Sequence, residues 1–255
     1  MSEIKRVYIN PGHSDKDPGA VGYEVERELA VKVAQYEKEH LLANYHCEVR
    51  MNPGTMGNLN DICEDANKWG AHLFDAKHFN ASKNHNGDGY EAWVFSEERK
   101  DLGRIYEKHT VAIGQNSRGV KIQPGFVVLR NTKMPAILNE CAFVDNKKDI
   151  EDWNDDAELK KMGIAHAEAA AEFLKLDKKE ETITVKFSTL SYGLKNEEAV
   201  KVAQALLKGF GYKVNPTGNF GKGTKAAVEA MQKDYGLLVT GVVDAATWKA
   251  LLCIK

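Results

Sequence analysis

Histidines and glutamates that follow apolar runs are the residues of this chain best suited to chemistry. His13 comes just after the apolar residues 7–9 and a Pro-Gly pair, which ends a strand because proline cannot donate to the hydrogen-bond ladder. His78 and Glu140 come directly after two later apolar runs, and Glu26 opens the amphipathic segment that follows the first loop. Open α/β sheets hold their ligands at the carboxyl ends of the strands. If the three runs are parallel strands of one sheet, His13, His78 and Glu140 converge at one edge.

Two imidazoles and two carboxylates are the side chains expected around a catalytic zinc ion. Such a site uses three protein ligands and leaves a fourth position for water, whose pKa falls to about 7 on the metal, so that it becomes a nucleophile at neutral pH. A carboxylate that does not bind the metal can accept the proton and pass it to the leaving amine. Each of the four residues taken alone has an ordinary structural role, in a turn, at a strand end or on the surface. Two strand-end histidines beside Gly- or Asn-containing loops favour the zinc site.

The sequence around these residues falls into four blocks. They occur in order, at suitable spacing, over the first two-thirds of the chain: NPGH at 10–13, DPGAVG at 17–22, HFNA at 78–81 and NECAFVDN at 139–146. Together they resemble the zinc-dependent N-acetylmuramoyl-L-alanine amidases of the amidase-3 family. The resemblance implies one Zn²⁺ ion per catalytic domain, held by His13, Glu26 and His78, with Glu140 as the catalytic carboxylate. It also implies hydrolysis of the amide between N-acetylmuramic acid and the L-alanine of the peptidoglycan stem peptide.

The chain departs from the family pattern at three positions in these blocks. Ser14 and Asp15 stand where the family usually has two glycines after the first histidine. Ala142 stands where the family usually has a glycine before the phenylalanine of the last block. None of the three is a ligand position, so the departures bear on the shape of the loops.

Other polar residues near the blocks are alternatives or helpers. Glu24 and Glu28 compete with Glu26 for the ligand role, and Glu26 is preferred because the apolar residues after it then match the apolar positions of the family's helix. Asn80 lies two residues past a ligand, where its amide could bond a group around the metal or the substrate. His85, in the polar loop beyond, is a second candidate for substrate contact. The other histidines are interpreted as structural residues, on the surface or partly buried: His40, His46, His72, His109 and His166.

Strands and helices alternate along the first two-thirds of the chain. Apolar runs bounded by Gly, Pro and Asn predict strands at residues 3–10, 47–51, 71–77, 90–95, 126–129 and 135–139. Apolar residues at helical spacing predict helices at residues 26–45, 58–70, 96–114 and 155–176. This order predicts an α/β fold, a mostly parallel sheet flanked by helices.

A charged stretch at residues 177–187 is predicted to link a catalytic domain, residues 1–176, to a second domain, residues 188–255. The second domain is predicted to be a small all-α unit of three helices. It resembles the peptidoglycan-binding domain 1 family over almost all of its length. The residues that carry this resemblance are Gln204, Leu207, Gly211, Tyr212, Gly218, Phe220, Gly221, Thr224, Ala227, Val228, Gln232, Gly236, Leu237, Gly241, Asp244, Thr247, Trp248 and Leu251. A tethered wall binder would keep the enzyme at high effective concentration on an insoluble polymer; the alternative is a module that only stabilises the enzyme.

The composition indicates which binding partners and which cellular compartment to expect. The 255 residues are 43% hydrophobic and 28% charged, with a net charge of −2, so nothing suggests a nucleic acid partner. No apolar run approaches the ~20 residues of a membrane span, and the N-terminus has no apolar signal core. Four scattered cysteines without a CxxC pair favour free thiols in a reducing compartment. We therefore expect a chain that stays in the cytoplasm until it is released onto the wall, as a phage or prophage endolysin does, with a mother-cell lytic enzyme of sporulation as the second possibility.

Two other functions fit parts of the sequence. Glu140 and Glu26 could be the carboxylate pair of a glycosidase that cuts the glycan strand without a metal, so insensitivity to a chelator would favour that reading. A non-catalytic wall-binding protein would bind peptidoglycan and release no new amino groups or reducing ends. The two strand-end histidines count against both. The sequence leaves open the preferred peptidoglycan chemotype and the oligomeric state.

Overall fold

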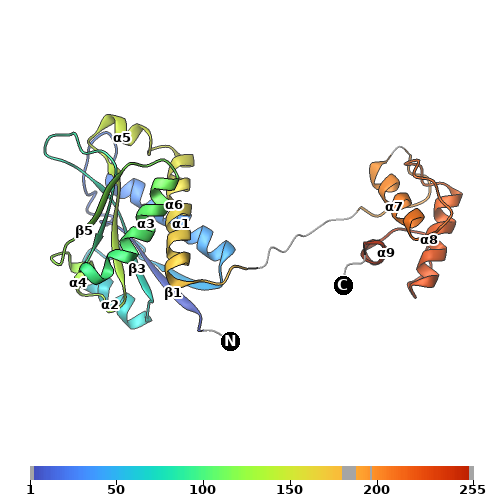
Figure 1. The fold of residues 1–255 in the computed structure, drawn as a ribbon, viewed down its shortest axis with the longest axis horizontal. Helices are drawn as coiled ribbons and strands as arrows, with labels where there is room; N and C mark the ends of the chain where they lie inside the picture. Colours follow the sequence, from blue (N-terminus) through green and yellow to red (C-terminus); the bar gives the residue numbers. More distant parts are fainter. Residues whose placement is uncertain (1–2, 180–187, 196, 253–255) are drawn as a thin grey trace. The chain divides into compact units, whose positions relative to one another are not determined.

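The chain divides into two compact units, residues 1–180 and 181–255. The computed structural model describes residues 3–179, 188–195 and 197–252 of the chain (Figure 1). The linker predicted at residues 177–187 falls outside the described residues from residue 180 onward. The domain boundaries given above therefore stay a prediction, and each unit is described by itself.

A mixed sheet forms the centre of the larger unit. Its six described strands lie in the order β2-β1-β3-β6-β4-β5. Their bounds are Lys5–Pro11 (β1), Cys47–Met51 (β2), Leu73–Asn80 (β3), Tyr90–Val94 (β4), Ser117–Ile122 (β5) and Ala136–Phe143 (β6). Only the β4–β6 pair is antiparallel among these strands; the other pairs are parallel. The predicted α/β fold with a mostly parallel sheet is confirmed.

Helices cover both faces of this sheet (Figure 1). Their bounds are Glu26–Asn44 (α1), Leu59–Trp69 (α2), Lys100–Ala112 (α3), Val127–Arg130 (α4), Lys147–Glu151 (α5) and Asp156–Leu174 (α6), with a 3-10 turn at Glu97–Arg99. On one face of the sheet, apolar residues of α1, α3 and α6 form a core with every second residue of the strands. On the other face, α2 and α4 form a second core with the intervening strand residues. This division follows from strand geometry, because successive side chains point to opposite faces.

One predicted strand is wrong, and one strand of the sheet was not predicted. Residues 126–129 were expected to be a strand, but they enter the short helix α4, where Val128 and Leu129 are buried against α2. Packing here overrides the strand propensity of valine, as tertiary contacts often do. The strand that was not predicted is β5, at one edge of the sheet, where Arg118, Gly119 and Lys121 interrupt any apolar alternation. Charged residues are common on edge strands, since they discourage pairing with other chains.

A buried ionic network lies behind the edge where the candidate site forms. The Lys77 ammonium lies 2.5 Å from Asp75 Oδ1 and 2.8 Å from Glu37 Oε2, and all three side chains are fully buried. Asn139 donates to Asp75 Oδ1 over 2.7 Å, and the Tyr106 hydroxyl donates to Asp75 Oδ2. Burial and the neighbouring Asp75 raise the pKa of Glu37 well above its usual range. The network ties α1 and α3 to β3 and β6, so it fixes the two strands that carry the candidate residues.

The replacement Lys77→Met is expected to destabilise the larger unit by about 3–5 kcal/mol, because it leaves buried carboxylates without their cation. The measurement is the midpoint of chemical denaturation of the full chain. Lys68→Met is the matched control, since Lys68 is an exposed lysine whose ion pair is on the surface of α2. Equal midpoints for the two variants would contradict the role given to the network.

One buried histidine corrects an expectation. His166 was interpreted as a surface or partly buried residue, yet it is fully buried on α6 between Tyr90 and Tyr106. Neither of its ring nitrogens has a hydrogen-bond partner among the described residues. Burial lowers its pKa well below the usual range, so His166 is neutral.

The smaller unit is a three-helix domain in its described residues, as predicted. Its helices are Glu198–Gly209 (α7), Lys222–Asp234 (α8) and Ala245–Leu251 (α9), packed around a separate apolar core. Two buried glutamines hold its turns. Gln204 accepts from the backbone N–H groups of Thr217 and Gly218, and Gln232 accepts from those of Thr240 and Gly241. Gly218 and Gly241 both have positive φ, which glycine adopts without steric cost.

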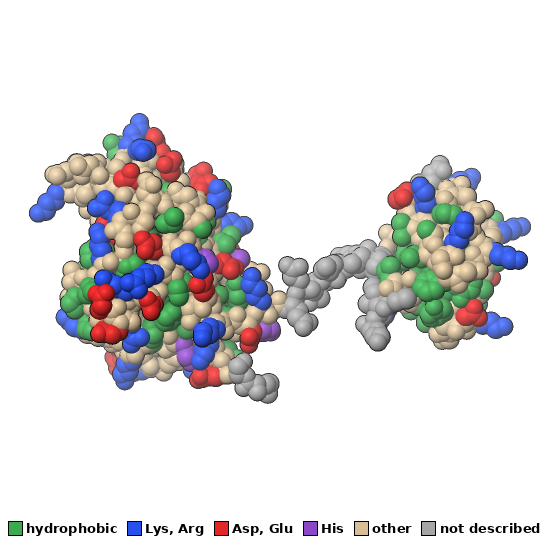
Figure 2. All heavy atoms as spheres, viewed as in Figure 1, with side chains coloured by type: hydrophobic (Ala, Val, Ile, Leu, Met, Phe, Trp, Pro, Cys, Tyr) green, Lys and Arg blue, Asp and Glu red, His purple; other side chains and the backbone are tan. Residues whose placement is uncertain are grey.

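The surface of the larger unit is mixed in charge on the face that Figure 2 shows, where acidic and basic side chains are interspersed. Among the described helices, none combines the length and the apolar character that crossing a membrane requires. Cys47, Cys63 and Cys141 carry free thiols, and Cys253 lies outside the described residues.

Candidate metal centre and active site

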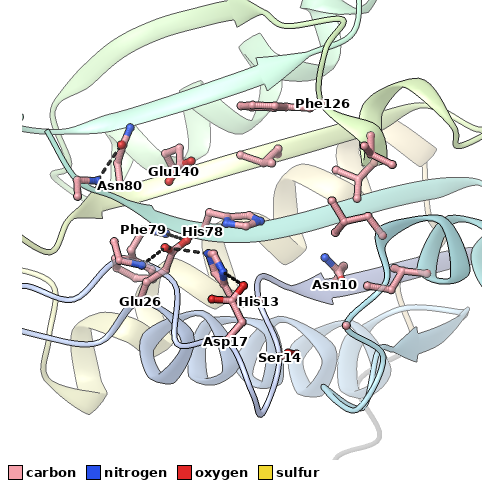
Figure 3. A pocket seen from close by; sticks show the side chains of 18 residues that line it. Asn10, His13, Ser14, Asp17, Glu26, His78, Phe79, Asn80, Phe126 and Glu140 are labelled. Carbon is pink, nitrogen blue, oxygen red and sulfur yellow. Dashed lines mark hydrogen bonds and ion pairs between the residues drawn. The ribbon is translucent and has the colours of Figure 1, made fainter. Parts of the chain in front are cut away.

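His13, Glu26 and His78 lie together at the carboxyl edge of the sheet (Figure 3). Glu26 Oε2 lies 2.9 Å from His13 Nε2, and Glu26 Oε1 lies 2.8 Å from His78 Nδ1. His13 lies in the loop just after β1, Glu26 in the first turn of α1 and His78 in β3. Each offers one ligand atom, and these atoms lie within 4.8 Å of one another. Two imidazoles and one carboxylate at this spacing fit a zinc ion, whose usual donors are nitrogen and oxygen atoms of these side chains.

The backbone conformation of His13 places its ring beside Glu26. His13 has φ = 65°, which is uncommon outside glycine, and this conformation turns its ring toward Glu26. Asp17 Oδ2 lies 2.9 Å from His13 Nδ1. A carboxylate on the far nitrogen fixes the tautomer of a metal-binding histidine and leaves Nε2 to bind the metal.

Two glycines allow the loop to pass close to the triad. A Cβ on Gly19 would lie 2.5 Å from both Glu26 Oε2 and His13 Nε2, and one on Gly12 would lie 2.4 Å from the His78 ring. No side chain can occupy either place without moving a triad residue. Glycine at these two positions is therefore a requirement of the site.

Glu26 is the glutamate that the fold brings to the histidines. It is buried, and its carboxylate also accepts from the backbone N–H groups of Ala20 (2.8 Å) and Phe79 (3.2 Å). Of the two competitors, Glu28 is exposed, and Glu24 accepts from Asn154 away from the triad. Neither competitor belongs to the triad.

The charges of the triad are strongly coupled. Hydrogen bonding to Glu26 raises the pKa of His13 to about 9 against the opposing effect of burial. Burial alone would raise the pKa of Glu26, but its hydrogen bonds with His13 and His78 outweigh burial and lower this pKa to about 2. Glu26 is therefore ionised at neutral pH, as a metal-binding carboxylate must be. A cation bound here displaces the proton that His13 otherwise carries.

Glu140 lies beside the triad on the neighbouring strand. It is the register partner of His78 across the β3–β6 pair and of Glu91 across the β6–β4 pair. Its Oε2 atom is buried and has no hydrogen-bond partner among the described residues. Exclusion of water raises the pKa of Glu140 to about 7, the charges of Glu26 and Glu91 add to the rise, and His78 opposes it. A carboxyl group with a pKa near neutrality can both accept and return a proton at pH 7.

A cavity of about 600 Å³ opens over these residues. One end holds the triad, Asn80 and Glu140, and Figure 3 shows Phe126 away from the triad toward the other end. The lining also includes apolar residues of α2, α4 and β6: Leu59, Ile62, Val127, Val128 and Leu138. A few polar groups in an otherwise apolar cavity are typical of a site that binds and orients a substrate.

Comparison with known proteins identifies the family. Residues 7–172 match the Amidase_3 family, described as N-acetylmuramoyl-L-alanine amidase, and this match covers more than half of the chain. The chain belongs to this amidase family. Residues 196–251 match PG_binding_1, a family of peptidoglycan-binding domains.

Named relatives agree with this assignment. The endolysin of Bacillus phage SPP1 is 32% identical over 187 residues, which are 69% of this chain and 68% of the relative. The sporulation-specific N-acetylmuramoyl-L-alanine amidase of Bacillus subtilis is 26% identical over 223 residues, which are 80% of this chain and 82% of the relative. The catalytic domain of the amidase CwlV from Bacillus (Paenibacillus) polymyxa superposes with a TM-score of 0.65 at 27% identity, over 68% of this chain and all of that domain. The chain is thus an N-acetylmuramoyl-L-alanine amidase that acts on the peptidoglycan of the cell wall.

Two of the three departures from the family pattern, Ser14 and Asp15, lie in a hydrogen-bonded turn of this amidase. Ser14 pairs with Asp17 in an isolated antiparallel bridge, and Asp15 Oδ1 lies 3.4 Å from the guanidinium of Arg27. Arg27 also donates to the carbonyl of Gly12 over 3.4 Å. The turn that replaces the two glycines therefore keeps Asp17 within reach of His13.

Two helper residues suggested by the sequence have different places. Asn80 lines the cavity, and its amide donates to Glu91 Oε2 over 3.2 Å. His85 does not line that cavity; its ring lies 2.9 Å from the buried carboxylate of Asp145 in the loop after β6. Asp17 was not identified from the sequence as the partner of His13. The position of Asp17, four residues after His13 and inside one of the matched blocks, could have indicated this role.

Proposed function

We propose that this amidase holds one zinc ion between His13, Glu26 and His78, with Glu140 as its catalytic carboxylate. The convergence of the three ligand atoms carries the proposal. The hydrogen bond that His13 Nδ1 donates to Asp17 Oδ2 supports it, because metal-binding histidines almost always have such a partner. A zinc ion bound there would lower the pKa of a coordinated water to about 7 and polarise the scissile carbonyl.

The chain's own residues then have distinct roles in cleaving the bond between N-acetylmuramic acid and L-alanine. Glu140 accepts a proton from the attacking water and returns it to the amine of the departing alanine. Its partnerless Oε2 supports this role, since a buried oxygen without a protein donor is ready to bond a reactant. Burial of Glu140 Oε2 strengthens its electrostatic interactions with the reacting atoms.

We further propose that the chain is a phage or prophage endolysin. The 32% identity with the SPP1 endolysin supports this assignment. The similarity to the sporulation-specific amidase of Bacillus subtilis extends over more of the chain, at 26% identity, and keeps a sporulation enzyme as the second candidate. In either case the PG_binding_1 unit would hold the enzyme on the wall and raise its effective concentration there.

A digest of purified peptidoglycan tests the activity and its metal. The full chain is expected to release stem peptides with a free alanine N-terminus, which mass spectrometry of the fragments identifies. A chelator should abolish the release, and added zinc should restore it, because the metal supplies the activated water. Calcium added in place of zinc is the control. If new reducing ends formed instead, at the same rate with and without the chelator, the result would support a metal-independent glycosidase.

A further inference from the structure

A second polar cluster lies on the same face of the sheet as Glu140, and the proposed chemistry does not use it. Its centre is Glu91 on β4, which is only 3% exposed. Glu91 Oε1 accepts from Arg118 Nε over 2.7 Å and from Lys121 Nζ over 2.5 Å. Glu91 Oε2 accepts from Asn80 Nδ2 and from Trp93 Nε1, each over 3.2 Å. Both oxygens of the carboxylate are thus fully engaged.

The cluster carries an excess positive charge, since one carboxylate faces two cations. The side chains of Arg118 and Lys121 are 40% and 32% exposed, so their charged ends reach solvent. Among the described residues, Arg118 is bonded only through Nε, and both of its terminal nitrogens lack a hydrogen-bond partner. A guanidinium with two unused terminal nitrogens can hold a second carboxylate.

Both cations are held in place before any ligand arrives. The Arg118 guanidinium lies 5.1 Å from the centre of the Phe143 ring, and the Lys121 ammonium lies 5.1 Å from that of Trp93. Each cation therefore has an aromatic face on one side and Glu91 on another. Fixing long side chains in advance lowers the entropy cost of binding.

The cluster borders the catalytic cavity. Glu91 is the register partner of Glu140, and its charge helps to raise the pKa of Glu140. Asn80 lines the cavity and donates to Glu91, and Phe126 lines the cavity and packs against Trp93 with ring centres 5.7 Å apart. A substrate bound over Glu140 thus lies next to the two cations.

We propose that Arg118 and Lys121 form a subsite that binds a carboxylate of the stem peptide close to the scissile amide. The inference rests on the proposed function, because it takes Glu140 to mark the place of the amide. The glycan strand next to that amide has no free carboxylate once the lactyl group is linked to alanine, whereas stem peptides carry free carboxylates. The cations therefore select the peptide side of the substrate and orient it over Glu140.

The test uses two soluble substrates, a muramoyl dipeptide whose second residue has a free α-carboxylate and the same compound with that carboxylate converted to an amide. The full chain, loaded with zinc, is expected to cleave the acid with a kcat/KM about 10–100-fold above that of the amide, as charge-assisted hydrogen bonds are lost with the amide. In Arg118→Gln the ratio of the kcat/KM for the acid to that for the amide should fall below about three, and most of the change should be in KM. Arg118→Lys should keep part of the preference, because it keeps the charge and loses the planar fork.

Arg104→Gln is the matched control, since Arg104 is an exposed arginine paired with Asp101 on α3, and it should keep the full preference. The ratio of the two rates separates recognition from folding, because a merely structural role for Arg118 lowers both rates equally. A wild-type ratio near one, or a ratio unchanged in Arg118→Gln, overturns the subsite and leaves the amidase assignment intact. Failure of the wild-type chain to cleave either compound in the presence of zinc would instead count against the proposed chemistry.

Discussion

The replacement Glu140→Gln is expected to lower peptidoglycan turnover by about 10²–10⁴-fold, the usual contribution of a positioned general base. Glutamine has the size of glutamate but cannot accept the proton of the attacking water. The fold should not change, because Glu140 Oε2 has no partner among the described residues to lose. The measurements are the rate of release of new amino groups from purified peptidoglycan, the zinc content and the midpoint of thermal unfolding.

The zinc content separates this role from that of a ligand. Glu140→Gln should keep the zinc content and unfolding midpoint of the wild-type chain while it loses turnover. Lysis at the wild-type rate by this variant would remove Glu140 from the mechanism. A variant that is inactive and has also lost zinc would show that Glu140 acts on the metal rather than on the proton.

The second large effect is expected at the metal triad. Replacing a residue that only hydrogen-bonds to a metal ligand typically lowers metal affinity by about 10–100-fold. His78→Ala removes a proposed ligand itself, so zinc affinity should fall by more than this. Activity should fall together with zinc affinity. Glu26 Oε1 also loses one of its partners, which weakens the packing of β3 against α1. Zinc titration of the metal-free full chain measures the affinity, and the same preparation gives the activity.

Glu28→Gln is the matched control for the glutamate of the triad. Glu28 lies in the same first turn of α1 as Glu26, but its side chain is exposed. Glu26→Gln should weaken zinc binding, whereas Glu28→Gln should bind zinc as the wild-type chain does. The reverse result would mean that the wrong glutamate of this helix has been assigned to the metal.

Residues at strand ends explain why so much of the site could be predicted from sequence. His13, His78 and Glu140 each follow an apolar run, and parallel strands bring their carboxyl ends to one edge. Glu26 was chosen because the apolar residues after it match the apolar positions of the family's helix, and α1 begins at this residue. A general rule of sheet topology predicted that the three strand-end residues converge, whereas the choice of Glu26 and the role of each residue came from the family resemblance.

Features that depend on long-range contacts could not be predicted in this way. Lys77 and Asp75 lie in a strand that reads as apolar, and only Glu37 from α1 shows why they are tolerated there. Arg118 and Lys121 read as the polar residues of a loop, and their partner Glu91 lies 27 and 30 residues away in the chain. Pairings of this kind are specified by the fold as a whole, so no local pattern reveals them.

Anomalous X-ray diffraction from crystals of the zinc-loaded chain, with data on both sides of the zinc absorption edge, locates the metal directly. We expect a single zinc peak about 2.0–2.2 Å from one ring nitrogen of His13, one ring nitrogen of His78 and a carboxylate oxygen of Glu26. Glu140 should lie close by without binding the ion. A zinc peak at any other group of residues, or fully loaded protein with no peak at the triad, would rule out the proposed metal centre.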